Sequence, residues 1–384
     1  MADAGQHHRI IEFFCGVGGL HYAMSESGVK HQVACAFDVD NMALATYSLN
    51  HPKTATSSAD IVSLTEGALA RLAADTWLLS PPCQPYTRQG DAGRRDRNRD
   101  NGTDGRANAL ERLIQLLGSC DEATLPSFLF LENVVGFESS ATRSRLTAIL
   151  IQRGFYFREL WASPIHFGVP NQRTRYFLLA RRTADFGDWG GQSPMATDIN
   201  SGAQSVEEHL HLLQLDQASI DAAIAEGRRV DAPTGMPDEL VMAKCGALDS
   251  YLLPKDSEQL QQLAVPDHVL ERYGLAMDFV TRQSCRTCCF TKNYSRYIKG
   301  TGSILLEAVT TMPTLHDAPS LEDLRVLRPR FFAPSEIAAI HGFPRSFAFP
   351  AHITRKKQYE LLGNSLSVPV VTLLVRALFA PAPT

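Results

Sequence analysis

The stretch that decides the expected fold runs from Arg9 to Gly19 and reads RIIEFFCGVGG. Its first half is rich in apolar residues, as in a buried strand, and its glycines stand directly before the helical spacing of Leu20 to Ser27. Glycine at such a turn lets the backbone adopt positive φ and approach a ligand closely. A dinucleotide fingerprint starting at Gly16 would require glycine at position 21, where the chain has His21. The stretch therefore predicts a ligand-binding unit of strand, turn and helix, and it disfavours NAD.

The same alternation of short apolar runs and amphipathic stretches continues on both sides of this unit. Further strands are predicted at 32–37, 76–80, 128–132 and 176–180, and helices at 20–27, 41–50, 65–73, 108–117, 144–153, from Pro334 onward and at 368–379. Several of the strands are apolar throughout, which is typical of a parallel sheet covered on both faces. We therefore expect an α/β fold with a mostly parallel sheet and helices on both faces.

Composition narrows the class of protein. The chain has 384 residues, is 44% apolar and 20% charged, and carries a formal net charge of −4. No apolar run approaches the roughly 18 residues of a membrane span, and the N-terminus lacks the pattern of a signal peptide. Eight cysteines are too few for a disulfide scaffold. We expect a cytoplasmic or nuclear protein with reduced thiols and no membrane partner.

The alternation of predicted strands and helices stops near Asp185, which indicates a second unit. Glycines and a proline cluster between Gly187 and Gly202, and an acidic stretch with helical character follows. The predicted domains are 1–188, then 189–325 with the acidic helical insertion, then 326–384 as a return to the first domain. Residues 198–278 contain 15 acidic and 5 basic side chains.

A basic segment at 281–300 contrasts with that acidity. It contains no acid, and aromatic residues are interleaved with its five cations, which are Arg282, Arg286, Lys292, Arg296 and Lys299. Cations for phosphates and aromatics for unstacked bases are typical of single-stranded nucleic-acid contacts. A solvated loop that offsets the acidic neighbour would have the same composition.

Two carboxylates at predicted strand ends point to a nucleoside. Asp38 closes the second strand, where it could accept hydrogen bonds from both ribose hydroxyls, and Asp60 with Ile61 ends a third, weak strand near an adenine amino group. Either aspartate alone is more often a turn former. Together with the glycine turn, they favour an adenosine-bearing ligand without a pyrophosphate.

A proline-flanked cysteine is the candidate nucleophile. Cys83 lies in Ser80 to Pro85 (SPPCQP), after a predicted central strand. The prolines make burial in a strand ladder unfavourable, so the loop can present a thiolate. The alternative is a small buried cysteine, as expected for the other seven.

Glu132 and two arginines complete the candidate chemistry. Glu132 ends a strand, where a desolvated carboxyl could act as an acid or donate to a ring nitrogen. Arg173 and Arg175 alternate onto one face and could grip a phosphate or orient a carboxylate. The alternatives are a helix or turn cap for Glu132 and a solvated pair for the arginines.

Taken in order, Pro-Pro-Cys-Gln at 81–84, Glu-Asn-Val at 132–134 and Gly-Asn-Ser at 363–365 resemble the cytosine carbon-5 methyltransferases outside about 190–280. Cys289-Phe290-Thr291 and the residues after it resemble the branch that is homologous to DNA methyltransferases but methylates transfer RNA. The resemblance implies a Rossmann-like S-adenosylmethionine-dependent methyltransferase fold with a smaller target-recognition domain at 189–325.

The resemblance also implies roles for individual residues. The cofactor-binding residues it implies are Phe14, Gly16, Val17, Gly18, Gly19, Asp38, Asp60, Ile61, Asn364 and Ser365. The catalytic residues would be Cys83, Glu132, Arg173 and Arg175. The RNA-binding residues would be Arg282, Arg286, Cys289, Phe290, Thr291, Lys292, Arg296 and Lys299, with Cys289 close to the active site.

The implied function is methylation of an anticodon-loop cytosine, by resemblance in aspartate tRNA, through a covalent Cys83 adduct. A DNA cytosine-5 methyltransferase would use the same residues, and a non-catalytic RNA-binding protein could keep the fold. Zinc at Cys285-x-x-Cys288 is disfavoured because no second pair of ligands lies nearby, so no metal is expected.

Overall fold

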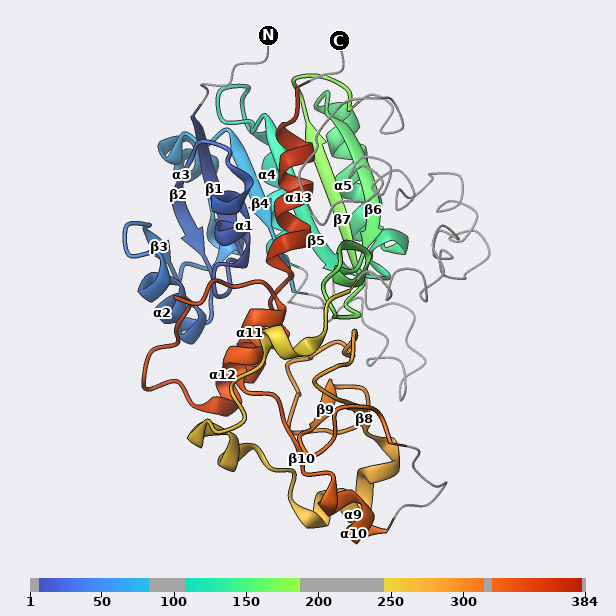
Figure 1. Cartoon of the computed structure of the whole chain (residues 1–384). Helices are drawn as coiled ribbons and strands as arrows, with labels where there is room; N and C mark the ends of the chain where they lie inside the picture. The colour runs from blue at the N-terminus through green and yellow to red at the C-terminus, as the bar shows by residue number, and fades with distance from the viewer. Residues whose placement is uncertain (1–6, 83–107, 187–244, 314–319, 382–384) are drawn as a thin grey trace. The chain divides into compact units, whose positions relative to one another are not determined.

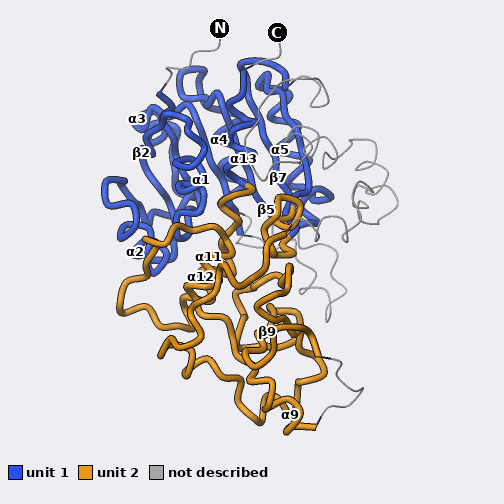
Figure 2. The backbone as a smooth tube through the Cα atoms, viewed as in Figure 1, with its two compact units in different colours: residues 1–162, 174–235, 371–384 blue, residues 163–173, 236–370 orange. Residues whose placement is uncertain are grey.

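The computed structural model describes residues 7–82, 108–186, 245–313 and 320–381. The chain divides into two compact units (Figure 2), the first made of 1–162, 174–235 and 371–384, the second of 163–173 and 236–370. The predicted nucleophile Cys83, the boundary glycines and most of the predicted acidic insertion lie outside the described residues.

The first unit is built on a seven-stranded sheet in the order β3-β2-β1-β4-β5-β7-β6 (Figure 1). Every neighbouring pair is parallel except the two that involve β7, which runs antiparallel to β5 and β6. The strands are β1 (His8–Phe13), β2 (His31–Phe37), β3 (Thr56–Ser57), β4 (Thr76–Leu79), β5 (Phe128–Val134), β6 (Tyr156–Ala162) and β7 (Arg175–Arg181). The parallel strands bring the ends of β1, β2, β4 and β5 to one edge of the sheet.

Helices cover both faces of this sheet. Side chains alternate along a strand, so Ile11 and Phe13 of β1 face the hydrophobic cluster of α3, α4 and α5, while Glu12 faces α1 and α2. On the Glu12 side α13 lies along α1, since the Thr372 hydroxyl donates to the Ala23 carbonyl. The helices of this unit are α1 (Gly19–Ser27), α2 (Asn41–Asn50), α3 (Glu66–Leu72), α4 (Asn108–Ser119), α5 (Ala141–Gln152) and α13 (Val368–Phe379).

The second unit contains a small sheet in the order β10-β9-β8, with β8 and β9 parallel. Its strands are β8 (Asp278–Val280), β9 (Ser303–Leu306) and β10 (Pro329–Arg330), and its α-helices are α9 (Asp267–Tyr273), α10 (Leu321–Val326), α11 (Pro334–Ile340) and α12 (Arg355–Gly363). Short 3₁₀ helices across the chain are η1 (Ile61–Ser63), η4 (Phe137–Ser139), η5 (Pro164–Phe167), η6 (Leu248–Tyr251), η7 (Glu258–Leu263) and η8 (Gly274–Ala276).

The α/β expectation is confirmed, and all five predicted strands and seven predicted helices are present within a few residues. The prediction missed β6, because Arg158 and Glu159 interrupt its apolar pattern. Glu159 is buried in an ion pair with Arg143, so tertiary contact overrides the local signal.

The two compact units divide the chain differently from the predicted domains 1–188, 189–325 and 326–384, which remain a prediction. Residues 163–173 and 326–370 belong to the second unit and not to the first. The physical reason is side-chain packing, since Glu336 of α11 pairs with Arg330 and Tyr359 of α12 packs on Tyr294.

Among the described residues, one stretch is long and apolar enough to cross a membrane, namely Arg355–Phe379, which contains α12 and α13. Its most apolar window is 67% buried inside the protein, as in a core helix.

Candidate functional site

The predicted glycine turn is strained in the way that close ligand approach requires. After β1 the backbone takes positive φ at Phe14 (58°), Gly16 (53°) and Gly18 (90°), and α1 starts at Gly19. A Cβ on Gly18 would lie 2.7 Å from the His51 ring, whereas a Cβ on Gly16 would meet nothing within 4 Å. Gly18 is therefore required by packing beneath the turn, and Gly16 leaves space around it.

Asp38 holds this turn from the end of the neighbouring strand. Its Oδ2 accepts from the Gly16 amide at 2.8 Å, and its Oδ1 accepts from the Asp40 amide at 2.9 Å. The parallel pairing of β1 and β2 explains why residues from separate strand ends meet here. Asp38 thus lies at the predicted ligand turn and has a structural role that the sequence did not indicate.

Asp60 and Ile61 form the start of η1. One Asp60 oxygen caps the helix by accepting from the Val62 amide at 3.0 Å, and the Ile61 side chain is buried in the core, as Val17 is. Any contact that Ile61 or Val17 makes with a ligand would therefore come from backbone or from the small exposed edge of the side chain.

A buried polar chain beneath the turn was missed by sequence reasoning. The Tyr47 hydroxyl lies 2.8 Å from Glu12 Oε2 and 2.7 Å from His21 Nδ1, and the His21 and His51 rings stack at 3.8 Å between centroids. Burial raises the pKa of Glu12 to about 8 and lowers the pKa of His21 to about 3 and of His51 to about 4. All three are therefore neutral in the folded protein near pH 7. A glutamate inside an apolar strand was the available signal.

Glu132 is fixed at the same sheet edge by two side chains. Its Oε2 accepts from the Ser80 hydroxyl at 3.0 Å, and its Oε1 lies 3.3 Å from Arg175 Nε. The pairing of β5 with β4 and with β7 brings these residues together. Glu132 is only 7% exposed, so its carboxyl is held in a defined direction. Cys83 follows Ser80 by three residues.

Arg173 does not share a face with Arg175. Its guanidinium is buried and donates to the Phe290 carbonyl at 2.9 Å, to the Gly363 carbonyl at 3.0 Å and to the Ser365 carbonyl. It also lies 3.2 Å from Cys289 Sγ. Of the two roles predicted for this pair, gripping a phosphate or orienting a carboxylate, Arg175 is placed for the second, since it pairs with Glu132, whereas Arg173 links two backbone segments of the second unit.

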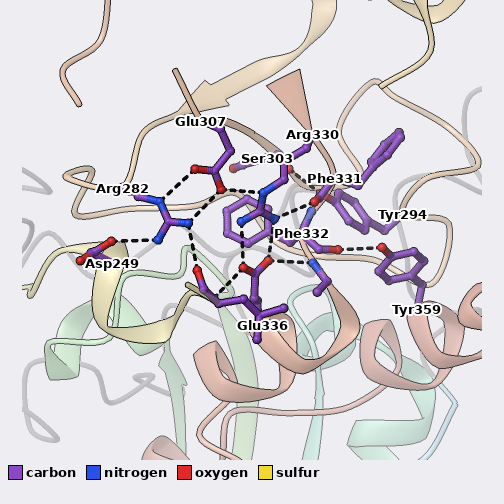
Figure 3. Close-up of polar contacts among 12 residues, drawn as sticks. Asp249, Arg282, Tyr294, Ser303, Glu307, Arg330, Phe331, Phe332, Glu336 and Tyr359 are labelled. Carbon is purple, nitrogen blue, oxygen red and sulfur yellow. Dashed lines mark hydrogen bonds and ion pairs between the residues drawn. The ribbon is translucent and has the colours of Figure 1, made fainter. Parts of the chain in front are cut away.

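Some cations of the basic segment 281–300 are paired with carboxylates in the structure, and others are exposed. Arg282 is 6% exposed and pairs with Asp249 and Glu307 in the network of Figure 3, and Arg286 pairs with Asp278. This geometry does not support the predicted phosphate contact of Arg282, because its guanidinium is buried and pairs with the buried Glu307 and the exposed Asp249. Arg286 remains partly exposed, at 37% of its side chain.

Phe290 is also buried, and its ring packs edge-on against Tyr294 and Phe332. It supports the fold and does not offer a stacking face, so its predicted base contact is corrected too. Cys289 and Thr291 are half-buried beside it, whereas Lys292, Arg296 and Lys299 are exposed.

The predicted cofactor residues come from both units. Phe14 to Gly19, Asp38, Asp60 and Ile61 belong to the first, while Asn364 and Ser365 follow α12 in the second. Among the described residues, no group of three or more His, Cys, Asp or Glu is arranged to hold a metal. Cys285 packs against Cys245, and the Cys288 amide donates to Ser303.

Comparison with known proteins places this geometry in a family context. The family model described as "C-5 cytosine-specific DNA methylase" matches residues 8–380. The human protein named "tRNA (cytosine(38)-C(5))-methyltransferase" is 34% identical, with 97% of this chain and 99% of that protein covered. A Dictyostelium discoideum protein named "DNA (cytosine-5)-methyltransferase" is 31% identical over 97% of this chain and 94% of its own length.

Solved structures agree in fold. The Entamoeba histolytica methyltransferase EhMeth superposes with a TM-score of 0.73 at 27% identity, covering 97% of this chain and 98% of that one. The Schizosaccharomyces pombe Dnmt2 methyltransferase superposes with a TM-score of 0.72 at 27% identity, with 97% and 98% covered.

Proposed function

The chain belongs to the C-5 cytosine-specific DNA methylase family, which uses S-adenosylmethionine, and from that premise we propose that it methylates carbon-5 of a cytosine in transfer RNA. The observation that carries the choice of RNA is the near full-length match, on both sides, to the human protein named for cytosine 38 of tRNA. The proposed target is the corresponding anticodon-loop cytosine, in aspartate tRNA.

The residues of the first unit fit the proposed cofactor. Gly16 is open, the turn is held by Asp38, and one oxygen of Asp60 caps η1 while the residue stays exposed. Carboxylates at these two strand ends suit the hydrogen-bond donors of an adenosine, with Asp38 at the ribose hydroxyls and Asp60 at the adenine amino group. When bound there, S-adenosylmethionine supplies an electrophilic methyl group.

The chain's own residues would prepare the base. The Cys83 thiolate adds to carbon-6 of cytosine, which breaks the aromaticity of the ring and makes carbon-5 nucleophilic. Glu132, oriented by Ser80 and Arg175, donates a hydrogen bond or a proton to ring nitrogen N3 and so stabilises the negative charge that thiolate addition pushes into the ring. After methylation, carbon-5 loses its proton and the bond from carbon-6 to the Cys83 sulfur breaks, which regenerates the thiolate.

DNA is the second candidate substrate. One relative of comparable identity is named as a DNA methyltransferase, so membership of the family does not separate the two. Extruding a base costs a few kcal/mol from a duplex and less from a loop, which favours the anticodon loop for the same residues.

The direct test is transfer of a labelled methyl group from S-adenosylmethionine to tRNA and to duplex DNA, followed by bisulfite sequencing of the tRNA. We expect labelling of tRNA at one anticodon-loop cytosine and its loss in Cys83→Ala, with tRNA binding retained. Labelling of DNA with none of tRNA would overturn the RNA proposal, and an active Cys83→Ala enzyme would overturn the covalent step.

A further inference from the structure

Helix α12 begins with three consecutive cations. Arg355 and Lys356 are exposed and form no ion pair among the described residues, while Lys357 pairs with Glu360 at 2.8 Å. Thr354 caps the helix by accepting from the Lys357 amide. The sequence analysis did not single out this segment.

These cations are badly placed for the helix itself. The first turn of a helix carries partial positive charge, so a cation there is disfavoured by about 0.3–1 kcal/mol, and α12 has no acidic residue in that turn to offset it. The two unpaired cations therefore do not serve the stability of α12.

The helix packs on residues 291–294 of the basic segment through a buried tyrosine and the backbone. The Tyr359 ring of α12 contacts the Tyr294 ring at 5.2 Å between centroids. At the other end of the helix, a Cβ on Gly363 would lie 2.1 Å from the backbone nitrogen of Lys292. Both segments thus lie within the second unit and touch at two places, although about 60 residues separate them in sequence.

Together the two segments are strongly positive. Residues 291–299 and α12 contain six lysines and arginines and one acid, Glu360, which Lys357 already pairs. Tyr297 is 55% exposed, with the Arg296 guanidinium over its ring at 5.4 Å. Unpaired cations beside an exposed aromatic suit a phosphate backbone with accessible bases.

We propose that Arg355 and Lys356 join Lys292, Arg296 and Lys299 in one surface that contacts the phosphate backbone of the RNA substrate. This inference rests on the proposed function. It replaces the buried Arg282 of the sequence prediction with two cations from α12.

The experiment compares the double charge reversal Arg355→Glu/Lys356→Glu with a matched control, Lys255→Glu/Arg272→Glu. The control makes the same change in net charge at exposed cations of the same unit that lie outside both segments. Affinity for unmodified tRNA and for duplex DNA is measured from low to high KCl, with wild type alongside.

We expect the α12 reversal to weaken tRNA binding about tenfold or more and to reduce the slope of log affinity against log salt by about 1 to 2, with the control close to wild type. Glutamate is favourable in the first turn, so the melting temperature of the α12 variant should not fall. Equal tRNA affinity in the two variants would overturn this surface alone. Wild-type protein that binds and methylates DNA but not tRNA would overturn the proposed function instead.

Discussion

The burial of the Glu12 carboxyl makes the free energy of unfolding depend on pH. Its pKa is raised by burial from 4.5 to about 8, so between these values the unfolded chain loses a proton that the folded chain keeps. Raising the pH through this window therefore favours unfolding. His21 and His51 act in the opposite direction, because their lowered pKa values make stability rise with pH until the unfolded histidines are neutral, near 6.5. Above pH 6.5, Glu12 is the member of this group that still titrates.

The substitution Glu12→Gln removes that titration and keeps an acceptor for Tyr47. We expect the variant to gain stability relative to wild type by about 2 kcal/mol between pH 6.5 and pH 8, since one pKa unit corresponds to about 1.4 kcal/mol. Chemical denaturation at several pH values measures the difference. Parallel stability curves for the two proteins would contradict a buried neutral carboxyl.

Arg173 joins two elements of the second unit. Its guanidinium connects Phe290 of the basic segment 281–300 with Gly363 and Ser365 at the end of α12. Lysine has one nitrogen and cannot replace donors that reach the Phe290, Gly363 and Ser365 carbonyls together. Arg173→Lys leaves at least one of these carbonyls without its donor, at about 1–3 kcal/mol if it is the buried Phe290 carbonyl and less for the partly buried Gly363 and Ser365 carbonyls.

We expect Arg173→Lys to lower the melting temperature and to speed amide hydrogen exchange at 289–291 and 363–366. Arg175→Lys is the matched control, because it perturbs Glu132 and should lower kcat without changing exchange in those segments. Similar exchange in both variants would show that Arg173 does not hold the two segments.

At the scale of the whole molecule, charge organises the second unit. Figure 3 shows Arg282 and Arg330 on either side of Glu307. Arg330 also donates two hydrogen bonds to the Glu336 carboxylate, from Nη1 to Oε2 at 2.7 Å and from Nη2 to Oε1 at 2.8 Å. Burial disfavours the ionised form of Glu307 and would raise its pKa. Hydrogen bonds from the two arginines outweigh this effect and hold the pKa below the usual value. The network ties β8, β9, β10 and α11 together around a small sheet.

Removing the most buried carboxylate should destabilise this unit selectively. Glu336→Gln removes one of the two carboxylates that pair with the buried Arg330, Glu307 being the other, and we expect a loss of about 1.5–3 kcal/mol. Asp249→Asn is the control, since its side chain is 55% exposed and its pair with Arg282 is worth about 1 kcal/mol or less. Calorimetry should show a lowered transition only for Glu336→Gln, and equal shifts would contradict the buried network.

The formal net charge of −4 does not show how charge is distributed over the folded protein. The sequence located five positive charges at 281–300, and the structure neutralises two of them, Arg282 and Arg286, with carboxylates of the same unit. Packing of α12 on the remainder brings Arg355 and Lys356 to the same region. The positive surface is therefore assembled from two segments and cannot be read from either alone.

Local sequence signals were enough to predict five strands of the first sheet and its helices, and they put the candidate site residues at strand ends. Those features depend on local signals, namely the period of apolar residues, the glycines that permit positive φ before α1, and polar residues such as Asp38 and Glu132 at strand ends. The order of the strands in the sheet was not predicted. Strand β6 was missed because its Glu159 interrupts the apolar pattern and is stabilised by Arg143 from another element.

The roles of the charged side chains depend on tertiary contacts. Arg173 meets Cys289 across 116 positions of sequence, and Arg282, which composition assigned to RNA, is buried with Glu307. Glu12 is neutral because the packing around it removes solvent, and its neighbours in sequence do not indicate Tyr47 or His21 as partners. The physical reason is common to all three: the state of a charge depends on burial and on partners brought from distant segments, and neither is encoded in a local pattern.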